Sequence, residues 1–237
     1  MMRHRLFRRR ALGLNMSILI TGASGGLGPA VVDAFLATGA TVFGVARSWK
    51  RGNPHNSTRF HAIEADVNTD EGCDTAVEAA APVKGLIHLV GAFTGGKRVE
   101  ETDDATFDQM INANLRSAFR MIRAVLPGMR EAGHGRILVM GSRAADEPMA
   151  GSSVYNASKA GLAALIRTVA LENKKTNLTA NLVAPSVIDT PANRAAMPSA
   201  DYAKWVAPES IARLLVWLAS DEASDISGAV IPIYGRV

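Results

Sequence analysis

The sequence predicts one doubly wound α/β domain, in which helices cover both faces of a parallel sheet of about seven strands. Apolar strand-like runs alternate with amphipathic helical patterns along the chain, and no internal repeat or linker interrupts them. The chain has 237 residues, 48% of them hydrophobic, which is enough to bury a sizeable core. Aromatic residues are few, at 5%, so small side chains favour close packing of helices on a sheet over an aromatic-rich β-sandwich.

The basic residues of the chain gather at its N-terminus. Residues 1–15 hold five arginines and no acidic residue, and these arginines exceed the net charge of +4, so the rest is close to neutral. Such an arm could contact nucleic acid or a membrane surface. We instead expect a disordered arm at 1–15 and a folded domain at 16–237, without a nucleic-acid or membrane partner. A cleaved signal peptide does not fit, because the apolar run after the arginines continues into a strand that the fold needs.

Cysteine usage and hydropathy bear on the compartment. Cys73 is the single cysteine, so the chain forms no internal disulfide, and we expect a cytoplasmic protein in a reducing environment. Cys73 lies in a helical pattern, where we expect a small buried side chain rather than a nucleophile. No run of eighteen apolar residues predicts a membrane span.

The first elements predict a dinucleotide site. A strand is expected at 17–21 (SILIT), followed by the glycine loop GASGGLG and a helix that stops near Gly39. Glycines let the backbone approach a pyrophosphate, and the helix N-terminus favours its charge. The spacing of Gly22, Gly26 and Gly28 leaves three residues between the first two glycines, unlike the one-residue gap of the common dinucleotide fingerprint.

The next two strands, at 40–46 and 59–67, end in residues that indicate which cofactor binds. An acidic residue after the second strand would bind the ribose hydroxyls of NAD, but this chain has Arg47, whose guanidinium suits the 2′-phosphate of NADP. A surface arginine at a strand end is the alternative. Asp66 ends the third strand, where it either reaches the adenine amino group or caps the following helix.

A fourth strand is expected at 84–93, with Gly91 near its carboxyl end and His88 in a structural role within it. A long amphipathic helix follows at 102–133. Asn114 lies in the middle of this helix, where asparagine is a poor helix former, so we expect it to hydrogen-bond the backbone or hold a water.

The fifth strand, at 136–142, ends in Ser142, and the helix at 152–173 carries Tyr155 and Lys159 on one face. A tyrosine beside a fixed ammonium is a plausible proton donor, because the positive charge favours tyrosinate. Two such residues on one helix face also occur by chance. The remaining elements are a strand, a helix and a last strand at 178–184, 208–220 and 229–234.

These residues together resemble the short-chain dehydrogenase/reductase family over nearly all of 17–237. TGASGGLG is similar to the family's Thr-Gly-x-x-x-Gly-x-Gly loop, and NLVAPSVIDT to the segment that holds the nicotinamide amide. The resemblance implies four catalytic residues: Asn114, Ser142, Tyr155 and Lys159. Together with Arg47, it implies cofactor contacts from the residues of these motifs: Thr21, Gly22, Ser24, Gly26, Leu27, Gly28, Arg47, Asp66, Val67, Gly91, Tyr155, Lys159, Pro185, Ile188 and Thr190.

The chain departs from the family pattern at two places. The family's Asn-Asn-Ala-Gly is here His-Leu-Val-Gly, ending at Gly91, and Ser186 replaces the glycine after Pro185. A narrower resemblance to dihydropteridine reductase is visible in LVGAFTGG and at 189–205. That enzyme prefers NADH and lacks the serine that this chain keeps as Ser142.

The resemblance implies an NAD(P)H-dependent oxidoreductase that transfers a hydride to a small carbonyl or imine, with NADPH preferred. Tyr155 would give the proton, Ser142 would hydrogen-bond the oxygen, and Lys159 would lower the pKa of Tyr155. Asn114 would continue a proton path through water. Dihydropteridine reduction and a non-catalytic NAD(P) sensor are the alternatives. The resemblance also implies a homodimer or homotetramer.

The segment at 191–207 follows the nicotinamide-side strand, and we expect it to form a lid over a small or flat substrate. Met197, Tyr202 and Trp205 either line the pocket or pack the lid onto the domain.

Overall fold

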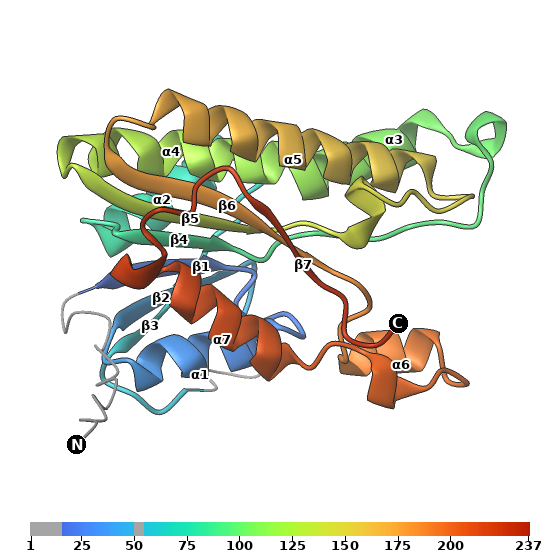
Figure 1. The fold of residues 1–237 in the computed structure, drawn as a ribbon, viewed down its shortest axis with the longest axis horizontal. Helices are drawn as coiled ribbons and strands as arrows, with labels where there is room; N and C mark the ends of the chain where they lie inside the picture. Colours follow the sequence, from blue (N-terminus) through green and yellow to red (C-terminus); the bar gives the residue numbers. More distant parts are fainter. Residues whose placement is uncertain (1–15, 50–54) are drawn as a thin grey trace, which may run out of the picture.

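The computed structural model describes residues 16–49 and 55–237. In this part of the chain, seven strands form one parallel sheet in the order β3-β2-β1-β4-β5-β6-β7 (Figure 1). Their bounds are β1 (Ser17–Thr21), β2 (Thr41–Ala46), β3 (Phe60–Glu64), β4 (Gly85–His88), β5 (His134–Met140), β6 (Asn177–Pro185) and β7 (Val230–Ile233). The predicted doubly wound sheet is confirmed. The arm expected at 1–15 lies outside the described residues.

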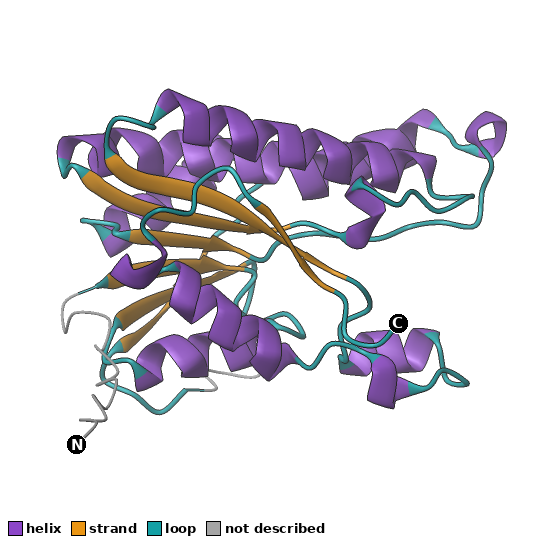
Figure 2. Ribbon diagram, in the orientation of Figure 1, coloured by secondary structure: helices purple, strands orange, loops and turns teal. Residues whose placement is uncertain are grey.

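Helices cover both faces of the sheet, as Figure 2 shows. α1 and α7 lie on one face, and α2, α4 and α5 lie on the other. The helix bounds are α1 (Gly28–Ala37), α2 (Asp70–Ala80), α3 (Asp104–Ile111), α4 (Ser117–Glu131), α5 (Ser153–Glu172), α6 (Pro191–Ala196) and α7 (Pro208–Leu218). In β1, Ile18 and Ile20 pack against α1 while Leu19 packs on the opposite face, which explains why this strand is apolar throughout.

The order of the strands locates the site. From β1 the sheet grows through β2 and β3 in one direction and through β4 to β7 in the other, so the order reverses between β1 and β4. In open parallel sheets, ligands bind at the carboxyl ends of the strands beside such a reversal. The ends of β1, β4, β5 and β6 therefore bring Thr21, His88, Met140 and Pro185 to one edge.

The helix predicted at 102–133 is interrupted. α3 and α4 are joined by a π-helical turn at Asn112–Arg116, where the N–H of Ser117 bonds to the carbonyl of Asn112, five residues back. The turn directs Asn114 into the interior, where its side chain is fully buried. Apolar periodicity carries no signal for one extra residue in a turn, so the expectation of a regular helix was wrong here.

The two side chains expected to be structural are buried. Cys73 is 2% exposed, and burial raises the pKa of its thiol to about 11, so it stays a neutral thiol. His88 bridges the hydroxyls of Thr21 and Ser117 at 2.8 and 3.2 Å. Burial, aided by the charge of Lys159, lowers the pKa of His88 to about 3, so the imidazole is neutral near pH 7.

Candidate active site

The three residues of the predicted proton-transfer group meet where β5 ends and α5 begins. Ser142 is the second residue after β5 and caps a short 3₁₀ turn, accepting a hydrogen bond from the N–H of Ala144 at 3.1 Å. Tyr155 and Lys159 lie on the first two turns of α5. The Nζ of Lys159 lies 5.9 Å from the ring centre of Tyr155 and donates to the carbonyl of Met140, the last residue of β5, at 3.0 Å.

Burial dominates the electrostatics of this group. Lys159 is 4% exposed, and desolvation lowers the pKa of its ammonium to about 8. Burial also raises the pKa of Tyr155, and a hydrogen bond with Ser142 opposes this shift only in part. The net pKa of Tyr155 is therefore raised and not lowered as expected, because burial is the largest influence on its hydroxyl.

Asn114 hydrogen-bonds Ala92 and Ser158, and its Nδ2 also makes a long contact of 3.9 Å with the sulfur of Met110. Its Oδ1 accepts from the N–H of Ala92 at 2.9 Å, and its Nδ2 donates to the carbonyl of Ala92 at 3.0 Å and to the hydroxyl of Ser158 at 3.2 Å. The expected backbone hydrogen bond is thus present. It holds the loop after β4 against the helix that carries Lys159.

Gly91 lies between Asn114 and Lys159. A Cβ built on Gly91 would lie 2.9 Å from Oδ1 of Asn114 and 3.3 Å from Nζ of Lys159. Only a residue without a side chain fits there without displacing one of these two groups.

The glycine loop at the start of α1 has the features that an anionic phosphate needs. Gly22 adopts φ +75°, and a Cβ there would lie 3.1 Å from the backbone nitrogen of Val90. Within the described part of the chain, the N–H groups of Ser24, Gly26 and Leu27 donate no hydrogen bond. Free N–H groups at a helix N-terminus favour an anion, so the loop suits a pyrophosphate.

Two side chains lie at the ends of β2 and β3, where the predictions assign the adenosine. Arg47 is exposed and forms no hydrogen bond or ion pair with any described residue. Asp66 is exposed and accepts from the backbone and the side chain of Asn68 at 3.0 and 2.8 Å. The alternative that Asp66 caps the next helix is wrong, because Thr69 is the N-cap of α2. Val67 is buried, at 4% exposure.

The segment after β6 leads from the sheet to the residues at 191–207, where a lid is expected. Pro185 ends β6, and Ile188 forms an isolated bridge with Val206. Thr190 caps α6 and lies against the glycine loop, since a Cβ on Gly26 would be 3.0 Å from its side chain. Ser186, which replaces the family's glycine, donates a hydrogen bond to the carbonyl of Tyr234 at 2.7 Å.

The segment at 191–207, where a lid is expected, is held together by contacts of its own aromatic residues. The rings of Tyr202 and Trp205 lie 4.8 Å apart, and the guanidinium of Arg194 lies 4.7 Å from the Tyr202 ring centre. Trp205 is 9% exposed, so it packs the lid onto the domain. Met197, at 37% exposure, remains available at the surface.

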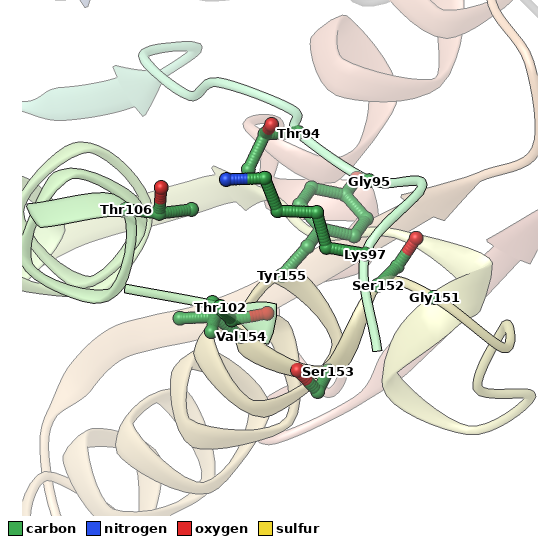
Figure 3. Close-up of a pocket in the computed structure, with 10 residues that line it drawn as sticks. All are labelled: Thr94, Gly95, Lys97, Thr102, Thr106, Gly151, Ser152, Ser153, Val154 and Tyr155. Atoms are coloured by element: carbon green, nitrogen blue, oxygen red, sulfur yellow. The ribbon is translucent and has the colours of Figure 1, made fainter. Parts of the chain in front are cut away.

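Sequence reasoning missed Phe93, whose ring contacts Tyr155 edge-on at a centroid distance of 4.9 Å. A cavity of about 20 Å³, the size of one water, lies beside Tyr155 between the loop at 94–97, the start of α3 and the N-terminus of α5 (Figure 3). The sequence signal was an aromatic residue in a glycine-rich stretch directly after Gly91.

The described part of the chain contains no helix long and apolar enough to cross a membrane. The same residues contain no cluster of three His, Cys, Asp or Glu side chains able to hold a metal ion.

A doubly wound sheet, a glycine loop at its first helix and a Ser–Tyr–Lys group at the same edge define a dinucleotide-dependent α/β oxidoreductase. The chain belongs to the short chain dehydrogenase family, whose model matches residues 16–200. It is therefore an NAD(P)-dependent oxidoreductase of the short-chain dehydrogenase/reductase type.

Relatives and solved structures agree with this family. The 3-oxoacyl-[acyl-carrier-protein] reductase MabA of Mycobacterium tuberculosis is 32% identical over 94% of this chain and 92% of its own length. The 3-oxoacyl-[acyl-carrier-protein] reductase FabG of Pseudomonas aeruginosa is 33% identical over 92% of this chain and 95% of its own. A 3-ketoacyl-(acyl-carrier-protein) reductase from Brucella melitensis, solved with NADH, superposes with a TM-score of 0.86 at 26% identity, covering 94% and 98% of the two chains. These relatives do not show the narrower resemblance to dihydropteridine reductase.

Proposed function

We propose that this enzyme uses NADPH to reduce a small carbonyl compound, or an imine, with Tyr155 as the general acid. The observation that carries the proposal is the convergence of Ser142, Tyr155 and Lys159 at the carboxyl end of β5. The free N–H groups at the start of α1 lie at the same edge of the sheet, which supports a cofactor bound across it.

The reduced nicotinamide supplies the hydride. Tyr155 is the proton donor, since burial keeps its hydroxyl protonated across the neutral range, and it gives that proton to the oxygen as negative charge develops there. Ser142 donates a hydrogen bond to the same oxygen and so stabilises the developing charge. Lys159 places a positive charge behind Tyr155, which favours the tyrosinate left after proton transfer.

Asn114 positions these groups through the loop after β4. Its side chain hydrogen-bonds both the N–H and the carbonyl of Ala92. Gly91, the residue before Ala92, lies between the side chains of Asn114 and Lys159. A proton path through water from Lys159 to Asn114 would start beside Gly91, where the two side chains approach each other.

Arg47 supports NADPH over NADH as the cofactor. It is exposed at the end of β2, has no partner among the described residues, and meets no carboxylate that would compete for its guanidinium. A guanidinium free of carboxylate partners suits a 2′-phosphate.

The substrate class is open to a direct screen. The two bacterial relatives are named as reductases of 3-oxoacyl thioesters, which makes such thioesters one class to test. Dihydropteridine reduction is the second candidate, and the glycine-rich loop that carries Phe93 beside Tyr155 is the observation that favours it.

The assembly we propose is a homodimer or homotetramer that forms through α4 and α5. A groove of about 320 Å³ runs between these helices and is lined by apolar side chains of both, together with Arg123, Arg130, Thr168 and Glu172. The apolar side chains include Phe119, Ile122, Leu126, Leu165 and Val169. We further propose a cytoplasmic location.

Replacing Tyr155 with phenylalanine tests the reaction. In Tyr155→Phe, we expect turnover to fall by at least about 100-fold, because the general acid is lost, while cofactor affinity changes by only a few fold. The measurement is oxidation of NADPH or NADH against quinonoid dihydropterin, 3-oxoacyl thioesters and simple ketones, with cofactor affinity from fluorescence titration. Cofactor binding without turnover of any carbonyl by the wild type would instead support the sensor.

A further inference from the structure

Phe93 is 62% exposed although its ring contacts Tyr155. The two rings meet at an interplanar angle of 84°, an edge-to-face arrangement that aromatic pairs favour. A single exposed aromatic residue is ordinary on a protein surface, so exposure alone assigns no role to Phe93. Its exposed ring lies next to the proposed proton donor, where a bound substrate could contact it.

The backbone on the N-terminal side of Phe93 is held rigidly. Ala92, its neighbour, exchanges hydrogen bonds with Asn114 through both its N–H and its carbonyl, at 2.9 and 3.0 Å. Asn114 is fully buried, so water does not compete for these bonds.

The backbone on the C-terminal side is held as well. The N–H groups of Gly96 and Lys97 both donate to the carbonyl of Gly151, at 2.8 and 3.3 Å, just ahead of the helix that carries Tyr155. Gly95 packs so closely on Ser152 that a Cβ would lie 2.6 Å from its hydroxyl oxygen. An exposed aromatic ring is thus presented on a loop that is fixed at both ends.

We propose that Phe93 determines specificity by holding a flat, unsaturated ring of the substrate next to Tyr155. This inference rests on the proposed carbonyl reduction and adds the substrate class, an aryl or conjugated cyclic carbonyl compound. A ring on a fixed loop loses little conformational entropy when a second ring packs on it. Aromatic partners gain from the quadrupole of the ring, whereas a saturated ring of similar size gains only apolar burial.

The charged side chains near Phe93 are consistent with an uncharged substrate ring in contact with it. Lys97 is the cation that lines the cavity beside Tyr155, and its ammonium pairs with the carboxylate of Asp103 at 3.3 Å. The open surface of Phe93 itself is apolar.

A matched pair of ligands tests the proposal. The enzyme loaded with oxidised cofactor, which cannot reduce a ketone, is titrated calorimetrically with benzylacetone and with its ring-saturated analogue. Wild type is expected to bind the phenyl compound about fivefold more tightly, the size of one aromatic pair interaction. Phe93→Leu should bring the two affinities to within about twofold, and Phe93→Trp should keep the preference. Phe107→Leu, at a phenylalanine of similar exposure on α3, serves as the control and should leave the preference unchanged.

Equal affinities in the wild type, absence of binding, or an equal loss for both ligands in Phe93→Leu would overturn the proposal. The last result would mean that Phe93 only supports the Tyr155 ring. Reduction of the same two ketones is measured in parallel. A wild type that discriminates between the rings in binding but reduces no carbonyl would refute the proposed function and leave ring recognition by Phe93 standing.

Discussion

Gly91 shows how one missing side chain shapes this site. It is the residue of the His-Leu-Val-Gly stretch that matches the family pattern, and a Cβ there would press on both Asn114 and Lys159. His88, at the start of that stretch, replaces an asparagine and bridges Thr21 to Ser117 as a neutral imidazole. The replacement at His88 is therefore accommodated by hydrogen bonds, while Gly91 is required by the space between Asn114 and Lys159.

Lys159 is expected to give the enzyme an alkaline limit. Its pKa is lowered to about 8, so the ammonium is charged below that pH and loses its charge above it, whereas the raised pKa of Tyr155 keeps that hydroxyl protonated. We expect kcat/KM for the reduced cofactor, which reports the free enzyme, to fall as pH rises through about 8. A pH–rate profile from pH 6 to 10 measures this, and a flat profile to pH 10 would contradict the role of the ammonium.

Arg47 is the residue through which cofactor preference can be changed. In Arg47→Asp, the guanidinium is lost and a carboxylate repels the 2′-phosphate, so the NADPH to NADH ratio of kcat/KM should fall by about 100-fold. Arg213→Asp, at an arginine on α7, makes the same charge change away from the carboxyl ends of β2 and β3. An unchanged ratio in Arg47→Asp would show that this arginine does not bind the phosphate.

At the scale of elements, the π-helical turn between α3 and α4 interrupts the regular helix and changes the direction of one side chain. It turns Asn114 inward, so that one side chain joins the loop after β4 to Ser158 on α5. The segment was predicted as one helix because its apolar pattern continues through the turn. Asn114, within this turn, hydrogen-bonds Ala92 and Ser158, which are 22 and 44 residues away in sequence.

Removing the Asn114 side chain tests this junction. Asn114→Leu leaves both the N–H and the carbonyl of Ala92 without a partner, and we expect the free energy of unfolding to fall by about 2–3 kcal/mol. Urea denaturation followed by circular dichroism measures the change. Asn112→Ala, on the same turn, removes only a surface contact with Arg116 and should cost less than about 0.5 kcal/mol. Equal stability of the two variants would contradict the stabilising role of the Asn114 side chain at this junction.

At the scale of the molecule, alternation of strands and helices was enough to predict the sheet. Each strand expected from an apolar run is present, with ends that differ by a few residues, because strands buried on both faces must be apolar throughout. The apolar pattern of the sequence did not predict the order of the strands in the sheet. The structure gives it as β3-β2-β1-β4-β5-β6-β7.

The groove between α4 and α5 is the surface through which we expect copies of the chain to associate. Phe119 is 46% exposed at this groove, so Phe119→Glu should leave the monomer folded and place charges in the interface. We expect light scattering after gel filtration to show a shift to monomer. Val99→Glu, at an exposed apolar residue outside the groove, should leave the mass unchanged. A mass unaffected by Phe119→Glu would exclude this surface.

By itself, the sequence determined the doubly wound architecture, the glycine loop and the residues Ser142, Tyr155 and Lys159, since each depends on local spacing and residue type. The tertiary structure decided what local spacing does not contain. Burial, which sums contributions from many distant segments, raised the pKa of Tyr155 where a neighbouring lysine had predicted a lowering. Contacts between residues far apart in sequence hold the Asn114 side chain of the π-helical turn and set Phe93 against Tyr155.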